Sequence, residues 1–186
     1  EGNCHPFVRR SNWPTRTLML QGDFSMTNVE ELHEKLMERG QHPVFDTNTQ
    51  AILEEVGYYL DEAHTDKYRE LRKQNVDGRE IPQIISAELN LFDVIGKACK
   101  DWDGGYVIMG AVGNGDFFCL RDPHGIRYCY YILTDEYLAV ASERVPLMSV
   151  MEVEESEVKE LNPGNMIVVK YDGAVTIREY TKPLEP

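Results

Sequence analysis

One stretch with residues suited to chemistry is Gly22-Asp23 and the polar residues that follow it. An apolar, strand-like run over Thr17–Gln21 ends there, and Ser25, Thr27 and Asn28 precede a helical pattern. Backbone N–H groups at the end of a strand can stabilise a developing oxyanion. A turn followed by a helix N-cap explains the same polar residues without a ligand, and the local sequence favours this structural interpretation.

A second stretch is Phe45–Gln50, which reads FDTNTQ. Asp46 or Thr47 can act as the N-cap of the helix that follows. Polar side chains crowded at a helix entrance can also hold the ammonium group of an amino-acid ligand. The residues alone leave both interpretations open.

A third stretch is Leu120–Arg127, which reads LRDPHGIR. The Arg-Asp-Pro-x-Gly sequence is favourable for a turn, and its charged pair can tie adjacent strands together. Catalysis by His124 would need a nucleophile or an acidic partner that we cannot locate. We therefore interpret this stretch as structural.

Common catalytic and cofactor motifs are absent from the sequence. It contains no GxSxG elbow, P-loop, GxGxxG or HExxH pattern. The five histidines show no metal-ligand spacing (His5, His33, His42, His64 and His124). We expect neither a metal nor a cofactor.

Composition limits the classes of partner. The 186 residues can bury a sizeable core, and 42% of them are hydrophobic. A formal net charge of −13 disfavours nucleic acid and anionic membranes as partners, and no apolar run is long enough to span a bilayer. The cysteines lack the CxxC spacing or density of a disulfide framework, which predicts a reducing, cytoplasmic location (Cys4, Cys99, Cys119 and Cys129).

Three helices are expected in the first part of the chain. Thr27–Gly40 begins with a Thr-x-x-Glu capping box and ends at glycine. A second helix should run from about Thr47 to Ala63, followed by a charged, solvated connection over His64–Glu80. Pro82 suits the first turn of a third helix, whose broad apolar face continues to about Cys99.

Strands are expected in the second part, where the periodicity changes. Short connections favour antiparallel pairing, and helices followed by strands indicate an α+β fold. The predicted strands are Tyr106–Ala111, Asp116–Arg121, Arg127–Leu133, Tyr137–Ala141, Asn165–Tyr171 and Val175–Tyr180, with Thr17–Gln21 as an earlier strand.

Taken together, the motifs resemble one family over nearly the whole chain. The stretches NCHPF, LQGDFSMTNVEEL, DTNTQAIL, WDGGYVIMG, LRDPHGIR, VASE and VKELNPGNMIVVKYDG follow the order of the class II glutamine amidotransferase domain. The resemblance is closest to the glutaminase half of the amidophosphoribosyltransferases. It implies a four-layer αββα sandwich of the N-terminal-nucleophile type with mostly antiparallel sheets.

The family's chemistry uses an N-terminal cysteine that attacks the side-chain amide of glutamine. The α-amino group of that cysteine acts as the base, giving a thioester and ammonia. The ammonia then passes to a phosphoribosyltransferase domain of the same chain, where it displaces pyrophosphate from phosphoribosyl pyrophosphate. The resemblance thus implies glutamine as substrate and a role in purine biosynthesis.

The resemblance also implies roles for individual residues. Gly22 resembles the glycine whose N–H forms part of the oxyanion hole, and Gln21 stands where members have the second donor, an asparagine. Thr47 and Asn48 fall in the stretch that holds the substrate ammonium, where Asn48 replaces an aspartate and removes its charge.

Gly104 and Gly105 resemble the start of the strand beside the glutamine pocket. Other features of the family are not found. Nothing in the sequence fits the N-terminal nucleophile, and Cys4 lies inside the aligned segment, so we do not assign it that role. The Arg-Tyr-Ser-Thr type stretch that binds the substrate carboxylate is absent as well.

Residues 1–186 are therefore expected to form a partial glutaminase domain that is truncated at its N-terminus and inactive by itself. The alternative is a non-catalytic binding or regulatory module that keeps the fold, which the departures at Gln21 and Asn48 favour. Removal of N-terminal strands would expose a sheet edge or apolar face, so a homo-oligomer is a further expectation.

Overall fold

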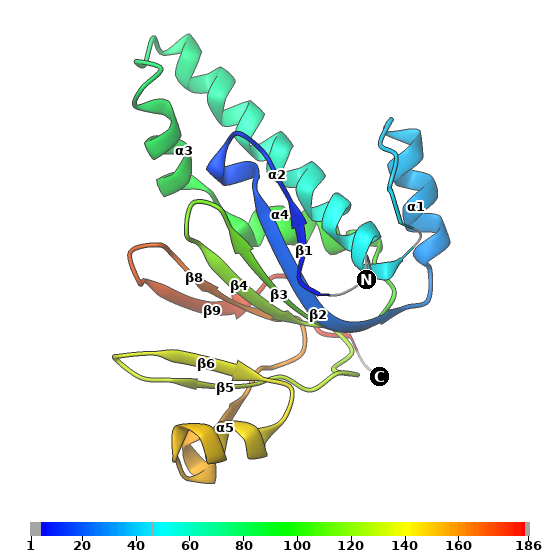
Figure 1. The fold of residues 1–186 in the computed structure, drawn as a ribbon, viewed down its shortest axis with the longest axis vertical. Coiled ribbons are helices and arrows are strands. Elements are labelled where there is room, and N and C mark those ends of the chain that lie inside the picture. The colour runs from blue at the N-terminus through cyan, green and yellow to red at the C-terminus, as the bar shows by residue number, and fades with distance from the viewer. Residues whose placement is uncertain (1–4, 46, 185–186) are drawn as a thin grey trace.

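A computed structural model describes residues 5–45 and 47–184. Four layers follow one another in Figure 1: helices α1 to α4, a large sheet, a small sheet and helix α5. Asp46 and Cys4, to which the sequence drew attention, lie outside the described residues.

The large sheet has six antiparallel strands in the order β1-β2-β3-β4-β8-β9. The small sheet has the order β6-β5-β7 and is also antiparallel. The strands are β1 (Phe7–Arg9), β2 (Leu18–Met26), β3 (Gly104–Val112), β4 (Phe117–Arg121), β5 (Tyr130–Leu133), β6 (Leu138–Ala141), β7 (Lys159–Glu160), β8 (Asn165–Val169) and β9 (Val175–Glu179).

The helices cover the outer faces of the two sheets. They are α1 (Val29–Glu38), α2 (Asn48–Lys73), α3 (Ile81–Glu88), α4 (Leu91–Ala98) and α5 (Arg144–Met151). Short 3₁₀ turns occur at η1 (Pro14–Arg16), η2 (Cys99–Asp101) and η3 (Glu155–Glu157). None of the helices in the described part of the chain combines the length and apolar character needed to cross a membrane.

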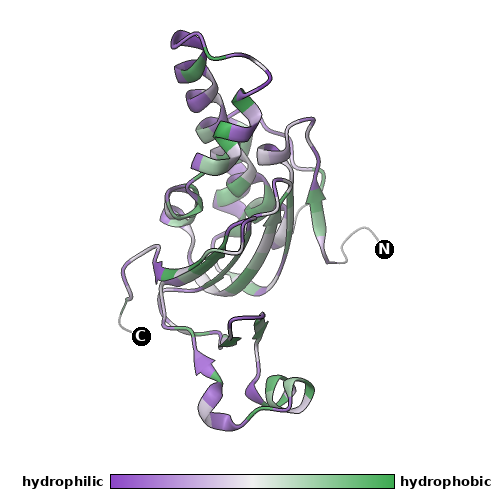
Figure 2. Ribbon diagram, turned by 90° about the vertical axis from the view of Figure 1, so that its left-hand side faces the viewer, coloured by the Kyte–Doolittle hydropathy of each residue, from purple (hydrophilic) through white to green (hydrophobic). Residues whose placement is uncertain are grey.

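Alternation along the strands divides the core between the two faces of the large sheet. On β4, Phe118 and Leu120 face the helices, whereas Phe117 and Cys119 face the small sheet. The strands of the large sheet are mainly coloured as hydrophobic in Figure 2, as expected for a layer covered on both sides. The predicted α+β sandwich with antiparallel sheets is confirmed.

The strands predicted in the second part of the chain are present, within a few residues at each end. The prediction that the chain leaves its strand at Gly22-Asp23 is wrong, because β2 continues to Met26. Pairing with β3 carries the strand through the glycine, with Gly22 opposite Ile108 and Met26 opposite Gly104.

The expected role of Thr27 as a helix cap is also wrong. Helix α1 begins at Val29 after Asn28, whose side chain makes no capping hydrogen bond. The Thr27 hydroxyl donates instead to the Asp103 carboxylate, and the Asn28 amide donates to the Asp101 carbonyl at 2.8 Å. These polar residues tie the end of β2 to the turn before β3.

Helix α2 extends ten residues beyond its predicted end at Ala63, through Lys73, so part of the expected charged connection is helical. The stretch is rich in residues that favour helices, which outweighs its polarity. The single helix predicted from Pro82 to Cys99 is two helices, α3 and α4, because Asn90 accepts a hydrogen bond from the Asp93 N–H and starts a new helix.

Candidate functional site

A pocket of about 330 Å³ lies on the face of the large sheet that is turned toward the small sheet. Strand β2 contributes consecutive residues to its lining, and β3 contributes apolar side chains to its wall. The lining residues are His5, Gln21, Gly22, Asp23, Val107, Met109, Tyr128 and Ser142. Two residues expected from the sequence to act together, Gln21 and Gly22, therefore share one pocket.

Only glycine fits at position 22. A Cβ built on Gly22 would overlap the carbonyl oxygen of Val107 and lie 3.1 Å from the Cα of Ile108. The close approach of β2 and β3 thus requires a residue without a side chain.

The backbone N–H of Gly22 points away from β3. Thr17 and Thr27 form the hydrogen-bonded pairs at the two ends of the β2–β3 ladder, through Gly113 N–H and Asp103 C=O. Hydrogen-bonded pairs alternate with non-hydrogen-bonded pairs in an antiparallel ladder, so the odd-numbered positions of β2 bond to β3. Gly22 therefore directs its N–H toward the side where β1 pairs with β2 only as far as Leu20.

Gln21 and Asp23 project from the same face of β2, because side chains alternate along a strand. Both side chains are exposed at the pocket. The Asp23 carboxylate lies 3.4 Å from a guanidinium nitrogen of Arg127, and Arg127 also donates to the Ser25 hydroxyl at 3.1 Å. A carboxylate and a guanidinium therefore stand together at the rim.

The loop before β5 positions Arg127. The buried carboxylate of Asp122 accepts hydrogen bonds from the N–H groups of Ile126 and Arg127, both at 3.0 Å. The buried Arg121 donates to the carbonyl oxygens of Arg127 and Gly125. These contacts support the structural interpretation of Leu120–Arg127, and they fix the backbone from which Arg127 extends.

Thr47 and Asn48 lie at the start of α2 and do not line this pocket. The Thr47 hydroxyl accepts a hydrogen bond from the Gln50 N–H at 3.2 Å, so Thr47 is an N-cap. The Gln50 side chain donates to Glu54 rather than completing a capping box. Helix α2 begins beside β1, as Figure 1 shows, and the Phe45 ring lies 6.4 Å from that of Phe7.

Gly104 and Gly105 are buried at the start of β3, and neither lines the pocket. Gly104 has a φ of +138°, and a Cβ there would overlap the carbonyl oxygen of Ser25. A Cβ on Gly105 would meet the side chain of Ile126 at 2.6 Å. Both glycines allow β3 to pack closely against its neighbours.

Sequence reasoning did not identify His5, Tyr128, Ser142 or Arg127 as part of this region. The sequence held a signal for two of them, because Arg127 is the last residue of the LRDPHGIR stretch and Tyr128 follows it directly. Ser142 belongs to the VASE stretch, which was noted for its resemblance only.

The three described cysteines lie outside the pocket. Burial raises the pKa of the Cys99 thiol to about 12, so this group remains protonated and a poor nucleophile at neutral pH. Cys119 and Cys129 are buried between the sheets with their sulfur atoms 3.6 Å apart. A hydrogen bond with Cys129, together with burial, raises the pKa of Cys119.

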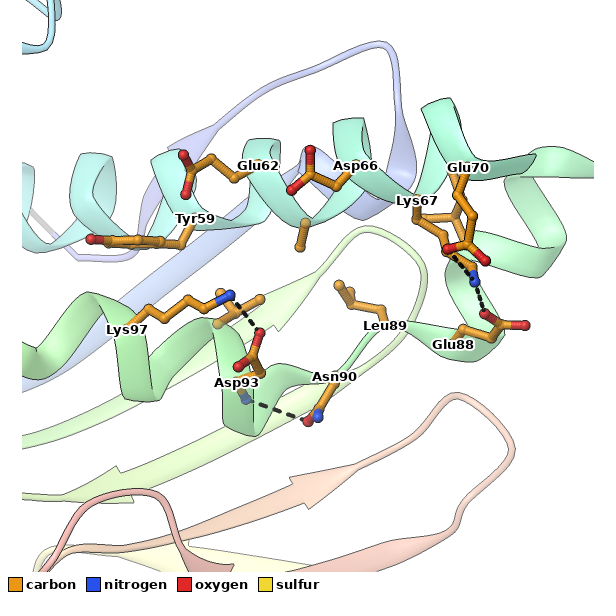
Figure 3. A pocket seen from close by; sticks show the side chains of 13 residues that line it. Tyr59, Glu62, Asp66, Lys67, Glu70, Glu88, Leu89, Asn90, Asp93 and Lys97 are labelled. Carbon is orange, nitrogen blue, oxygen red and sulfur yellow. Dashed lines mark hydrogen bonds and ion pairs between the residues drawn. The ribbon is translucent and has the colours of Figure 1, made fainter. Parts of the chain in front are cut away.

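A second pocket, of about 380 Å³, lies between α2, α3 and α4 (Figure 3). Its lysines are engaged by carboxylates: Lys67 contacts Glu70 and Glu88, and Lys97 contacts Asp93. None of the site residues predicted from the sequence lines it. No group of three or more potential metal ligands is found in the described ranges 5–45 and 47–184.

Comparison with known proteins identifies the family. The model of the class II glutamine amidotransferases matches residues 79–181, which is more than half of the chain. The chain belongs to this family. A search of curated proteins finds no match.

Solved structures of amidotransferases share the fold. One is the glutamine phosphoribosylpyrophosphate amidotransferase of B. subtilis in complex with ADP and GMP, with a TM-score of 0.67 and 18% identity over 96% of this chain. Another, described as the allosteric regulatory enzyme of purine biosynthesis, has the same TM-score, identity and coverage of this chain. This class II amidotransferase domain spans 32% and 31% of those two chains, respectively.

Proposed function

We propose that this chain forms part of the glutaminase domain of an amidotransferase that hydrolyses glutamine to glutamate and ammonia. Membership of the family supports the reaction class. The observation that carries the proposal is the pocket in which Gln21 and Gly22 lie side by side. The side-chain amide of Gln21 and the N–H of Gly22 are the donors that would face the oxyanion of a tetrahedral intermediate.

The ammonia acceptor in this proposal is phosphoribosyl pyrophosphate, bound by a phosphoribosyltransferase domain of the same parent chain. The proposed setting is purine biosynthesis in the cytoplasm. The two structurally similar proteins, a phosphoribosylpyrophosphate amidotransferase and a regulatory enzyme of purine biosynthesis, support this choice of pathway. Residues 1–186 would then be one partial glutaminase domain.

The other predicted site residues have supporting roles in the proposal. Thr47 and Asn48, at the start of α2, would approach the substrate from the end of β1. Gly104 would keep β3 close to β2, and Gly105 would keep it close to Ile126 in the loop before β5, so that the pocket holds its shape.

We further propose that the 186-residue chain binds glutamine without hydrolysing it. No thiol is present among the described residues that line the pocket, and positioning groups cannot replace a thiol nucleophile. The same observation favours a second function, a binding or regulatory module that keeps the amidotransferase fold without catalysis.

The test is to titrate the purified chain with L-glutamine by calorimetry and, separately, to assay glutamate and ammonia. We expect binding together with no turnover above a heat-denatured control. Turnover above that control would contradict the inactivity of the chain. Failure to bind glutamine at millimolar concentrations would contradict the assignment of the pocket.

The two proposed functions are distinguished by the sequence of the full-length protein. A Cys-Gly start together with an Arg-Tyr-Ser-Thr type stretch would support the enzyme. Their absence would support the binding module.

A further inference from the structure

Cys119 and Cys129 form a pair of neighbouring thiols that the proposed reaction does not use. Cys119 lies on β4, and Cys129 directly precedes β5 of the small sheet. Their sulfur atoms are 3.6 Å apart, and both side chains are fully buried. The sulfur atoms of a disulfide are about 2.05 Å apart, so these two need to approach by only about 1.6 Å. The pair is therefore within reach of a covalent link between the two sheets.

The two sulfur atoms are not equivalent. A hydrogen bond with Cys119 lowers the pKa of Cys129. Burial and the Glu160 carboxylate oppose this effect on the pKa, whereas the Arg121 guanidinium adds to it. The same hydrogen bond, together with burial, raises the pKa of Cys119. Because the thiolate is the reactive form of cysteine, Cys129 is the more nucleophilic member of the pair, and Cys119 keeps its proton.

Backbone contacts hold Cys129 in place beside β4. The guanidinium of Arg121, on β4, donates to the carbonyl oxygens of Arg127 at 2.6 Å and of Leu161 at 2.7 Å. The Leu161 N–H in turn donates to the carbonyl oxygen of Cys129 at 2.8 Å. The thiol of Cys129 is therefore kept next to Cys119 by hydrogen bonds that involve neither sulfur atom.

The pocket beside β2 and β3 gives a small oxidant a route to the pair. Val107 and Met109 line this pocket and belong to the same hydrophobic cluster as the two cysteines. Met109 also lies directly opposite Cys119 in the pairing of β3 with β4. A molecule in the pocket thus reaches the cluster that encloses the sulfur atoms. Because both sulfur atoms are buried, the oxidant that fits is one little larger than water, such as hydrogen peroxide.

We propose that Cys119 and Cys129 form a reversible disulfide when the chain is exposed to hydrogen peroxide. The Cys129 thiolate attacks one peroxide oxygen, which breaks the O–O bond and gives a sulfenic acid and hydroxide. The Cys119 sulfur then attacks the sulfenic sulfur, so the S–S bond forms, the S–O bond breaks, and the oxygen leaves as water with the Cys119 proton. The hydroxide takes up the proton that Cys129 had released. Two thiols and one peroxide thus give one disulfide and two water molecules, in a two-electron oxidation of the cysteines.

The disulfide has a consequence for the pocket. Tyr128 directly precedes Cys129 and lines the pocket, so a bond from Cys129 to β4 restricts the segment that carries this side chain. Disulfides in reducing compartments are usually transient, which suits a switch better than a permanent crosslink. The pair therefore acts as a redox-sensitive constraint on one wall of the pocket.

The test treats the purified chain with hydrogen peroxide and maps its disulfides by mass spectrometry. Trypsin cleaves after Arg121 and Arg127, so the two cysteines fall in different peptides that stay joined only through a disulfide. We expect the joined peptides after peroxide treatment and their separation after dithiothreitol. Hydrogen exchange of residues 126–131 should be slower in the oxidised chain, whereas that of α3, on the other side of the large sheet, should not change.

Single variants distinguish the two sulfur atoms. In Cys119→Ala, the oxidation of Cys129 should stop at the sulfenic acid, which dimedone would trap. In Cys129→Ala, Cys119 should not be labelled by dimedone, because its thiol stays protonated. Cys99→Ala is the matched control, since it removes another buried thiol, whose pKa burial raises to about 12, and it should form the disulfide like the unmodified chain.

The mapping of the unmodified chain decides the inference even if a variant fails to fold. Absence of the joined peptides, under conditions that oxidise free cysteine, would overturn the disulfide. Dimedone labelling of Cys119 in Cys129→Ala would overturn the assignment of Cys129 as the attacking sulfur. Unchanged hydrogen exchange of residues 126–131 would overturn the constraint on the pocket. None of these measurements uses glutamine, so their outcome is independent of the proposed function.

Discussion

Gly22 is the residue at which the packing of the sheet and the proposed chemistry meet. Its missing side chain lets the carbonyl of Val107 approach, and its N–H is directed away from β3. A single substitution there should therefore affect both stability and binding.

We expect Gly22→Ala to destabilise the fold by about 1–3 kcal/mol, as is typical when a methyl group is forced into a packed region. Urea denaturation followed by circular dichroism would measure the change, and glutamine binding should weaken in parallel. Gly78→Ala is the matched control, since a Cβ at that turn meets nothing within 4 Å. Equal stability of the two variants would contradict the close approach of β2 and β3.

The limits of prediction from sequence are clear at this residue. Gly22 lies at a close approach of β2 and β3, and its expected role in an oxyanion hole stays a prediction. The end of the strand there was a wrong prediction, since local sequence does not show that β3 pairs with β2 as far as Met26. The contact of Arg127 with the pocket residue Asp23 was missed because this ion pair joins positions more than 100 residues apart.

At the scale of elements, Arg121 on β4 connects the two sheets. It reaches the small sheet through Glu160 of β7, at 2.7 Å, and also donates to the carbonyl oxygen of Leu161 at 2.7 Å. Arg121 also donates to backbone carbonyl oxygens of the loop that carries Arg127. One buried guanidinium group therefore contributes both to the contact between the two sheets and to the position of the pocket rim.

Arg121→Met should lower the free energy of unfolding by about 1–3 kcal/mol, because it leaves the buried carbonyl oxygen of Leu161 without its donor. Chemical denaturation would measure this loss. Arg69→Met removes an exposed partner of Asp66 on α2 and should cost at most about 1 kcal/mol. Similar losses in both variants would show that Arg121 does not hold the sheets together.

The helices show which elements the sequence could predict. Gly40, with a φ of +81°, follows the end of α1 as its sequence position indicated. The break between α3 and α4 was missed although Asn90 is a favourable cap, because the apolar face continues across the break. Helix α5 was not predicted, as its sequence lacks a clear apolar stripe and its packing partners come from the small sheet.

At the scale of the whole molecule, β1 is an edge strand of the large sheet as far as residues 5–45 and 47–184 are described, and part of one face of the sheet is exposed there. Val8 and Met19 form a cross-strand pair that remains 48% and 43% exposed. An open edge strand with apolar side chains favours pairing with other chains. An exposed sheet edge or apolar face was predicted only through the family resemblance. The local sequence does not show which strand lies at the edge, because the order of strands in a sheet depends on pairing between distant segments.

We expect the chain to self-associate in a concentration-dependent manner. The double variant Val8→Lys with Met19→Lys should shift the equilibrium toward the monomer, because it places charges on the exposed apolar pair. Size-exclusion chromatography with light scattering would measure the masses. Val150→Lys, at an exposed position on α5, should leave association unchanged. A monomeric unmodified chain at all concentrations would contradict this expectation.

The C-terminal end of α2 and its contact with α3 have a practical consequence for experiments. There Leu71, Ile81 and Ile85 form a small hydrophobic cluster of their own, separate from the clusters that flank the large sheet. Figure 1 shows the connection from α2 to α3 at the opposite end of the molecule from the small sheet. A fluorescent label on a cysteine introduced at position 78, Gly78→Cys, would therefore leave the pocket beside β2 and β3 unmodified.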